Sequence, residues 1–327
     1  MINYYSQQGG GLECAQGEDS QSIPEGVLWV DLFSPSEEEE RFIEQALGVT
    51  IPTRLEMAEI EESSRFYRVG ETLYLTPTVI NSPVQQAAYK DEVFFVLGAQ
   101  VLVTVRYSEL SAVRSFVARA LLNSEIRYTK DLIFALLVDA FVDRMADTLE
   151  NMQARLGRML DQIFSPPEQS RREDAEKTDL QEVIRELGQT NGLLSKLNES
   201  LLAFGRLFIY VRMEGRRWIG AAALDLLKAF ERDVKSLNQY GSRMTQEIAF
   251  LLDATLGLIN IEQNAIIRVV SVAAVLFLPP TLVGTVYGMN FTDMPELHWN
   301  VGYPLALGLM LLSAVASYAL FKYKRWL

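Results

Sequence analysis

Two uncharged apolar runs near the C-terminal end constrain this chain more than any other feature. Residues 269–291 and 299–321 contain no Asp, Glu, Lys or Arg, and only seven residues separate them. Each run exceeds the roughly 20 residues that an α-helix needs to cross a hydrocarbon core of about 30 Å. The sequence therefore predicts a membrane protein that is anchored by a C-terminal helical hairpin.

The charges that flank the two runs predict the orientation of this hairpin. Arg268 precedes the first run and a basic tail, residues 322–327, follows the second. The connector between them, residues 292–298, carries only the acids Asp293 and Glu296. Because basic residues favour the cytoplasmic side, we expect both termini in the cytoplasm and the connector outside it.

Composition excludes several classes of function. The formal net charge of −12 over 327 residues disfavours nucleic acid as a partner and favours cations. The single cysteine, Cys14, and single histidine, His298, leave no internal disulfide, thiolate cluster or multi-histidine zinc site. No nucleophile with its base and no nucleotide-binding loop is visible, so we do not expect an enzyme.

Residues 1–125 have the pattern of an α/β domain. A buried strand is predicted over residues 26–33, and Ser36 followed by acidic residues predicts a helix that runs to about Leu47. A second acidic helix is predicted over residues 52–62. Further strands are predicted at residues 65–69, 72–80, 91–97 and 101–106.

The next region, residues 126–235, has helical periodicity. One long amphipathic helix is predicted over residues 129–164, where Ser165-Pro166-Pro167 ends it. Its expected antiparallel partner runs from Asp179 to about Met213, after a charged loop. Such a pair is typical of a structural scaffold, and its charged side chains are typical of solvated helix faces.

A third helical segment shows a heptad-like apolar seam and has no stop signal before the membrane. The seam consists of Leu237, Met244, Ile248, Leu251, Thr255 and Leu258. A continuous helix from about Ser236 to Gly288 spans about 80 Å at 1.5 Å per residue. The seam predicts self-association of this helix around an axis, which would extend through the bilayer.

The same helix carries a stripe of polar, small and apolar residues into the membrane. Steps of three or four residues place on one face Asn264, Ile267, Ser271, Ala274, Leu278, Thr281, Thr285 and Gly288. Such a stripe fits the lining of a pore. It fits equally the close packing of membrane helices on small residues, and periodicity alone leaves both interpretations open.

The residues around the connector resemble a known family. Tyr287-Gly288-Met289-Asn290-Phe291 closes the first apolar run, Met294-Pro295-Glu296-Leu297 follows, and a basic tail ends the second run. In this arrangement they resemble the bacterial members of the CorA family of divalent-cation channels. The resemblance is close over residues 250–327, and the earlier part matches it in layout.

The resemblance implies the fold class of an α/β cytoplasmic domain, a long helical stalk and two transmembrane helices, assembled as a homopentameric funnel in the bacterial inner membrane. The stalk and pore helix is expected over residues 236–291 and the second span over 299–321. The roles carried over are the outer selectivity ring of Gly288, Met289 and Asn290, the inner ring of Asn264, the constrictions of Val270 and Leu278, the lining residue Thr281, and the connector residues Asp293, Met294, Pro295, Glu296 and Leu297.

The implied activity is uptake of hydrated divalent cations, chiefly magnesium and also cobalt and nickel, driven by the membrane potential without ATP or a resident cofactor. In the family, intracellular cation bound between subunits closes the pore. The candidate acids here are Glu59, Asp233 and Asp253.

Two alternatives stay open. The related ZntB branch handles zinc with the same hairpin, and His298 beside the pore mouth is a softer ligand. From another class, the chain can be a membrane-anchored oligomeric scaffold, whose hairpin is only an anchor.

Overall fold

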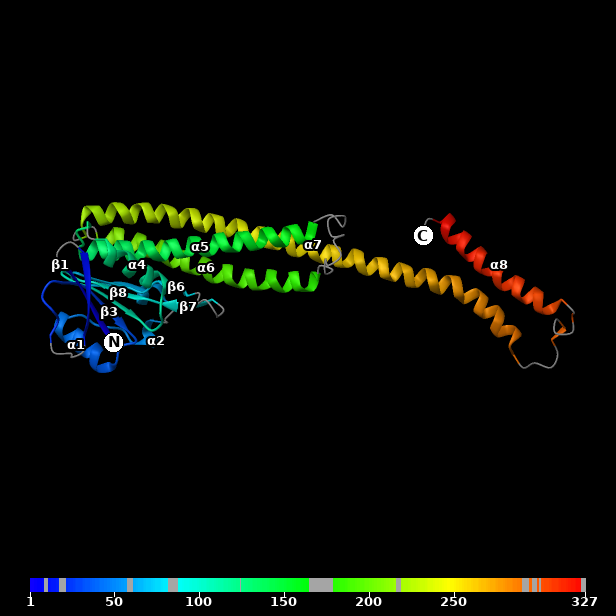
Figure 1. The fold of residues 1–327 in the computed structure, drawn as a ribbon, viewed down its shortest axis with the longest axis horizontal. Helices are drawn as coiled ribbons and strands as arrows, with labels where there is room; N and C mark the ends of the chain where they lie inside the picture. The colour runs from blue at the N-terminus through cyan, green and yellow to red at the C-terminus, as the bar shows by residue number, and fades with distance from the viewer. Residues whose placement is uncertain are drawn as a thin grey trace. The chain divides into compact units, whose positions relative to one another are not determined.

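The structure is a computed structural model in which the chain forms two compact units, Met1–Leu251 and Leu252–Leu327. It describes residues 1–8, 11–17, 22–57, 61–81, 88–123, 125–164, 179–215, 219–289, 294–295, 299 and 301–324. Helix α7 (Ala221–Tyr287) begins in the first unit and continues into the second without a break (Figure 1). One hydrogen-bonded backbone therefore joins the two units.

The first unit is built on a seven-stranded sheet with the strand order β2-β1-β3-β9-β8-β5-β4. Strands β3 and β9 pair in parallel, and the other neighbouring pairs are antiparallel. Strands β6 and β7 form a separate antiparallel pair. The bounds are β1 Ile2–Gln8, β2 Gly11–Gly17, β3 Val27–Phe33, β4 Phe66–Val69, β5 Thr72–Leu75, β6 Thr78–Asn81, β7 Tyr89–Glu92, β8 Phe94–Leu97 and β9 Leu102–Arg106.

The predicted strands at residues 26–33, 65–69 and 101–106 are confirmed as β3, β4 and β9. The sequence did not predict β1 and β2, although Ile2 and Tyr4 are buried in the core of this unit. These two strands extend the sheet beyond β3, so the α/β fold begins at the first residues of the chain.

The predictions of single strands over residues 72–80 and 91–97 are wrong. In both stretches the chain passes from one sheet to the other, from β5 to β6 at Pro77 and from β7 to β8 at Val93. Pro77 has no N–H to donate to a strand ladder, and its carbonyl oxygen accepts from the Val93 N–H at 3.4 Å. The two crossing points therefore lie side by side.

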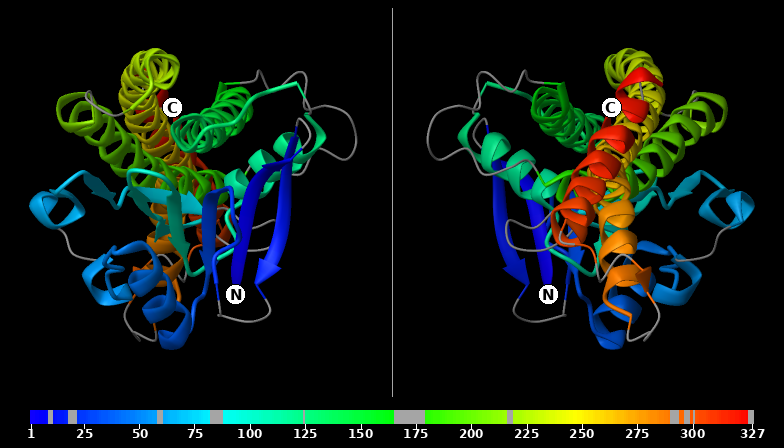
Figure 2. Two further views of the ribbon diagram at one scale, coloured as in Figure 1. Left: turned by 90° about the vertical axis from the view of Figure 1, so that its left-hand side faces the viewer. Right: turned by 90° about the vertical axis from the view of Figure 1, so that its right-hand side faces the viewer.

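Helix α1 (Glu37–Leu47) covers one face of the sheet (Figure 2). The Ser36 hydroxyl accepts from the Glu39 N–H, and the Glu39 carboxylate accepts from the Ser36 N–H, which completes a capping box. Fully buried Ile43 anchors the helix in a core that includes Val30 and Phe94. The predicted helix after Ser36 is confirmed.

The single helix predicted over residues 52–62 is wrong. The structure has two one-turn helices, α2 (Arg54–Met57) and α3 (Glu62–Arg65), and Glu61 between them is not helical. The Thr53 N–H donates to the Glu56 carboxylate at 2.8 Å, a local bond that stabilises a short capped turn. An acidic segment of this kind is therefore compatible with short capped turns as well as with one continuous helix.

Two long helices, α5 (Lys130–Phe164) and α6 (Leu180–Glu214), cover the opposite face of the sheet (Figure 2). Both were predicted within one or two residues. Aromatic rings hold them there, since Phe95 of β8 lies edge-on to Phe134 at 5.5 Å. A shorter helix, α4 (Ser111–Leu122), packs beside α5.

The first part of α7 packs within its own chain. Met244, Ile248 and Leu251 of the predicted seam are buried inside the first unit. A Cβ at Gly241 would clash with the Asn198 carboxamide of α6, so a larger residue at this close approach would displace that side chain. The prediction that these three residues mediate self-association is therefore wrong, because α7 uses them to pack in a single subunit.

The start of α7 is fixed by a buried carboxylate. The Gly220 N–H donates to Asp131 Oδ2 at 3.0 Å, and the Lys130 ammonium lies 2.7 Å from Asp131 Oδ1. Asp131 is only 9% exposed and belongs to the first turn of α5. This bond ties the beginning of α7, which lies earlier than the predicted Ser236, to the beginning of α5.

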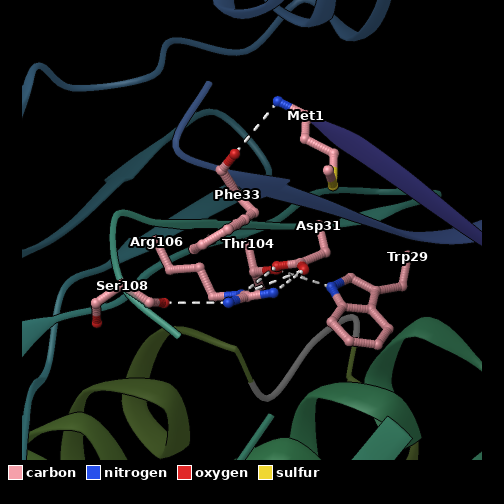
Figure 3. Close-up of polar contacts among 7 residues, drawn as sticks. All are labelled: Met1, Trp29, Asp31, Phe33, Thr104, Arg106 and Ser108. Atoms are coloured by element: carbon pink, nitrogen blue, oxygen red, sulfur yellow. Dashed lines mark hydrogen bonds and ion pairs between the residues drawn. The ribbon is translucent and has the colours of Figure 1, made fainter. Parts of the chain in front are cut away.

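A buried polar network joins the two parallel strands (Figure 3). The Arg106 guanidinium donates to both carboxylate oxygens of Asp31, at 2.9 to 3.2 Å. Thr104 donates to Asp31 at 2.7 Å and accepts from the Trp29 indole N–H at 2.9 Å. Asp31 is fully buried, so its charge is stable there only because Arg106 and Thr104 satisfy it.

We predict that Asp31→Ala lowers the free energy of unfolding by about 3 kcal/mol, because it leaves the Arg106 charge buried without its partner. The thermal midpoint of the purified protein should fall by roughly 6–10 °C. As a control, Glu37→Ala breaks the exposed pair with Arg41 and should shift the midpoint by about 1 °C or less. Equal shifts in the two variants would contradict a structural role for the buried pair.

Candidate ion pathway on the first membrane helix

The second unit contains two helices that are long and apolar enough to cross a bilayer. They are the second part of α7, which ends at Tyr287, and α8 (Gly302–Tyr323). Helix α8 overlaps the predicted second span. The C-terminal end of α7 continues as a turn, in which the Gly288 N–H donates to the Gly284 carbonyl at 3.0 Å.

One face of this part of α7 packs against α8. Half-buried residues recur there at steps of one and three: Val272, Val275, Leu276, Pro279, Pro280, Val283, Gly284 and Tyr287. The buried and half-buried residues of α8 are mostly small, with Met310 and Phe321 as the two large ones: Gly302, Ala306, Met310, Ser313, Ala314, Ser317 and Phe321. Small residues at a helix contact are typical of membrane proteins, because they let the two backbones approach closely.

The predicted pore stripe lies on the other face of α7. All its members are exposed in the single chain, and so is the predicted constriction residue Val270. The members are Asn264, Ile267, Ser271, Ala274, Leu278, Thr281, Thr285 and Gly288. Val270 is 63% and Leu278 is 72% exposed. At 3.6 residues per turn, the stripe points roughly 170° away from the residues that face α8. The small and hydroxyl residues of the stripe therefore do not serve the contact with α8.

The two threonines of the stripe present oxygen acceptors. Thr281 Oγ1 donates to the Phe277 carbonyl at 2.6 Å, and Thr285 Oγ1 donates to the Thr281 carbonyl at 2.8 Å. Each hydroxyl proton is thus used within the helix, and the oxygen lone pairs remain available. An oxygen of this kind can accept a hydrogen bond from water that surrounds a cation.

Several predicted residues lie outside the part of the chain that the structure describes. They are Asn290 of the expected selectivity ring, Asp293, Glu296 and Leu297 of the connector, and Glu59 of the expected regulatory site. Gly288 and Met289 are described and exposed, and so is Pro295, while Met294 is half-buried. The geometry of the ring at Asn290 accordingly stays a prediction.

The structure places Asp233, one of the predicted regulatory acids, beside α5. The pKa of Asp139 on α5 is raised to about 6, chiefly by burial. The Asp143 carboxylate adds to the rise, the Arg119 guanidinium opposes it, and Asp233 makes the smallest contribution to the rise. Asp233 itself is exposed on α7, as is Asp253, which belongs to the second unit. Within the described residues, no group of three or more His, Cys, Asp or Glu can hold a metal ion.

Asp139 was not among the residues predicted from the sequence. The signal was present, because this acid interrupts an otherwise apolar stretch of α5, residues 132–142. A carboxylate on the apolar side of an amphipathic helix is forced into partial burial, and there it meets whatever helix packs against that side. In this protein that helix is α4, whose Arg119 lowers the pKa of Asp139, and Asp233 of α7 raises that pKa from further along the same side.

Comparison with known proteins places the whole chain in one group. The family model described as CorA-like Mg2+ transporter protein matches residues 24–325. The magnesium transport protein CorA of Salmonella typhimurium is 32% identical over 330 residues, which cover 100% of both proteins.

Solved structures agree on the fold. The CorA magnesium transporter of Methanocaldococcus jannaschii matches with a TM-score of 0.77 at 15% identity, over 100% of this chain and 99% of its own. The ZntB cytoplasmic domain of Vibrio parahaemolyticus matches with a TM-score of 0.58 at 10% identity, over 79% of this chain and 97% of its own. At these identities the likeness concerns the fold alone.

We predict that Asp139→Asn stabilises the protein above pH 6 and much less below it. The pKa of Asp139 is raised in the folded state, whereas an unfolded aspartate titrates near about 3.9. Folding therefore favours the protonated form, and the cost of the charge grows as pH rises through the folded pKa. Allowing for the partial exposure of Asp139, we expect a gain of about 1 kcal/mol at pH 7.5.

The measurement is the difference in thermal midpoint between variant and wild type at pH 5 and at pH 7.5. Asp147→Asn, an exposed acid on the same helix, is the control and should give the same small difference at both values. A gain for Asp139→Asn that does not depend on pH would contradict the argument.

Proposed function

The chain belongs to the CorA-like Mg2+ transporter family, and from this premise we propose that it carries hydrated divalent cations, chiefly Mg²⁺, inward across a membrane. Cobalt and nickel are further expected substrates. The observation that carries the proposal is the exposed stripe on α7, which lies opposite the α8 contact and leads to Gly288. This stripe supports a pore lining formed by several copies of α7.

We propose a homopentamer in which each subunit contributes its α7 stripe to a central axis. Thr281, Thr285 and Asn264 are exposed on that stripe, and hydroxyl and amide groups are poorly accommodated by lipid tails. The face that carries α8 is apolar and suits the outside of the assembly. The number five comes from the family resemblance.

The polar groups of the stripe suit a magnesium ion that keeps its water. Mg²⁺ dehydrates reluctantly and prefers oxygen ligands in octahedral geometry. The Thr281 and Thr285 oxygens, with the amides of Asn264 and Asn290, accept hydrogen bonds from the waters of the ion and need not displace them. Neutral groups also release the ion more easily than carboxylates, as conduction requires.

Val270 and Leu278 are proposed as the hydrophobic constrictions. Both side chains are apolar and exposed in the single chain, on the side of α7 that carries the stripe. Rings of such side chains close a pore by excluding water, and they open it when a small increase in radius lets water return. The gate thus needs no charged residue within the membrane segment.

The membrane potential supplies the driving force in this proposal. A divalent cation that moves inward gains roughly 4.6 kcal/mol per 100 mV of inside-negative potential. The flanking charges support a plasma membrane location with both termini in the cytoplasm, because Arg268 and Lys322 flank the two spans at the ends away from the connector, and basic residues favour the cytoplasmic side.

Regulation is proposed to depend on intracellular cation bound between subunits, with Glu59, Asp233 and Asp253 as the candidate acids. A bound cation screens carboxylates that otherwise repel one another, and its loss lets the subunits move apart. The position of Asp139 beside Asp233 supports this site, because it adds negative charge on the same surface of α5 and α7.

We predict that wild-type protein in liposomes takes up Mg²⁺ when the interior is negative, and that Asn290→Ala reduces uptake at least about tenfold, because a lost ring of amides no longer orders the waters of the ion. Leu311→Ala, on the exposed side of α8, is the control and should retain uptake. Indifference of uptake to Asn290→Ala would favour the scaffold alternative.

The same liposomes distinguish the zinc alternative. Cobalt, nickel and zinc are added in turn as competitors of Mg²⁺ uptake, and a protein of the magnesium type should be inhibited by cobalt and nickel at lower concentrations than by zinc. The ZntB likeness is one of cytoplasmic fold and supports no statement about zinc.

We predict that the double variant Glu59→Ala and Asp233→Ala needs a higher cytoplasmic-side Mg²⁺ concentration for closure, because two carboxylates of the proposed site are missing. The measurement is current or flux during a titration of Mg²⁺ on that side. A control variant, Glu37→Ala with Asp225→Ala, removes two other exposed acids. Gating that is unchanged in the first variant would exclude Glu59 and Asp233 as sensors.

A further inference from the structure

Helices α7 and α8 make a close contact near the outer end of the membrane segment. At Gly284 a Cβ would lie 3.1 Å from the Met310 Cε atom, tighter than ordinary van der Waals contact. Gly308 on α8 has nothing within 4 Å of its Cβ position. The contact with Met310 therefore limits the size of the side chain that position 284 can carry, and no such limit applies at position 308.

Gly284 is also bonded to the first residue of the proposed selectivity ring. Its carbonyl oxygen accepts from the Gly288 N–H at 3.0 Å, and a Cβ at Gly288 would lie 3.1 Å from that same oxygen. The two glycines thus occupy one tight turn of backbone. A displacement of Gly284 away from α8 therefore moves Gly288 as well, through this hydrogen bond and the backbone of the turn.

The helix below this turn is weakened by two prolines. Pro279 and Pro280 lack the N–H groups that would bond to the carbonyls four residues earlier, those of Val275 and Leu276. The last two turns of α7 consequently depend more than usual on side contacts for their position. The Met310 side chain supplies such a contact.

We infer that Gly284 is a positioning residue for ion selection: the Met310 side chain packs on its bare backbone and so fixes where the ring that begins at Gly288 lies. The inference rests on the proposed function. A larger side chain at position 284 pushes the last turn of α7 away from α8, toward the proposed axis. The ring then narrows, and hydrated Mg²⁺ is bound less well.

The impairment of Mg²⁺ uptake should increase with the size of the side chain at position 284. The Met310 methyl is the far end of a flexible side chain, so it can move by the few tenths of an ångström that an alanine requires. Valine and leucine need more room than that movement provides, and the backbone must shift. The expected order of impairment is therefore Ala, then Val, then Leu.

The test is Mg²⁺ uptake into liposomes as a function of external Mg²⁺ concentration, in which the apparent KM reports binding at the ring and the maximal rate also reports the amount of folded protein. Gly284→Leu should raise the KM about tenfold, and Gly284→Ala less than about twofold, since overpacking on this scale has effects of that order. Gly308→Leu is the matched control and should leave the KM unchanged.

A compensating substitution distinguishes a positioning role of Gly284 from general damage to the fold. Met310→Ala makes room opposite position 284, so the double variant Gly284→Leu with Met310→Ala should return the KM to within about threefold of wild type. If Gly284→Leu does not accumulate as folded protein, Gly284→Val with and without Met310→Ala is compared in the same way.

The outcomes separate this inference from the proposed function. Wild-type uptake together with a KM that does not follow side-chain size, or a double variant no better than the single one, overturns the inference alone. A wild type without divalent-cation uptake overturns the proposed function and the inference with it. A graded KM with rescue supports both.

Discussion

The structure depends on the hydrogen-bonded continuity of α7. In a bilayer no water is available to satisfy backbone groups, so a segment that enters it must already be helical. Helix α7 meets this condition because it is formed by packing in the first unit, where Met244, Ile248 and Leu251 are buried, and it continues from there into the second unit. At its start Asp131 satisfies the Gly220 N–H. A single helix thus connects the fold of the first unit to the proposed ion pathway.

Within the membrane segment, α7 divides its surface between two tasks. Residues such as Leu276 and Val283 face α8, and residues such as Leu278 and Thr285 point the other way. In the proposed assembly this division matters, because a pore-lining helix must be held firmly on one side if its other side is to keep the pore at a fixed radius. The Gly284 contact with Met310 shows how closely that support approaches the C-terminal end of α7.

Sequence patterns predicted the long helices well and the sheet less well, for physical reasons. The apolar side of α5 and the Ser165-Pro166-Pro167 stop act locally, so its bounds follow from the residues alone. The crossings between sheets at Pro77 and Val93 depend on which strands pair, and local alternation does not contain that information. The same limit explains the seam of α7. The period of the seam predicted an apolar stripe on α7. It did not show that this stripe packs against other helices of the same chain.

Neutral and charged oxygen-bearing side chains of the candidate sites lie in different parts of the chain. The described stripe within the membrane segment offers hydroxyl oxygens and apolar side chains without any carboxylate, whereas acids such as Asp139 and Asp233 lie in the first unit. A divalent cation bound by carboxylates in a low-dielectric pore would be held too strongly to leave. Carboxylates in a water-exposed region bind the same ion weakly and reversibly, because solvent screens them. In the proposed transporter the neutral oxygens serve conduction and the carboxylates serve sensing, and α7 carries members of both groups, Thr281 and Thr285 in its second part and Asp233 in its first.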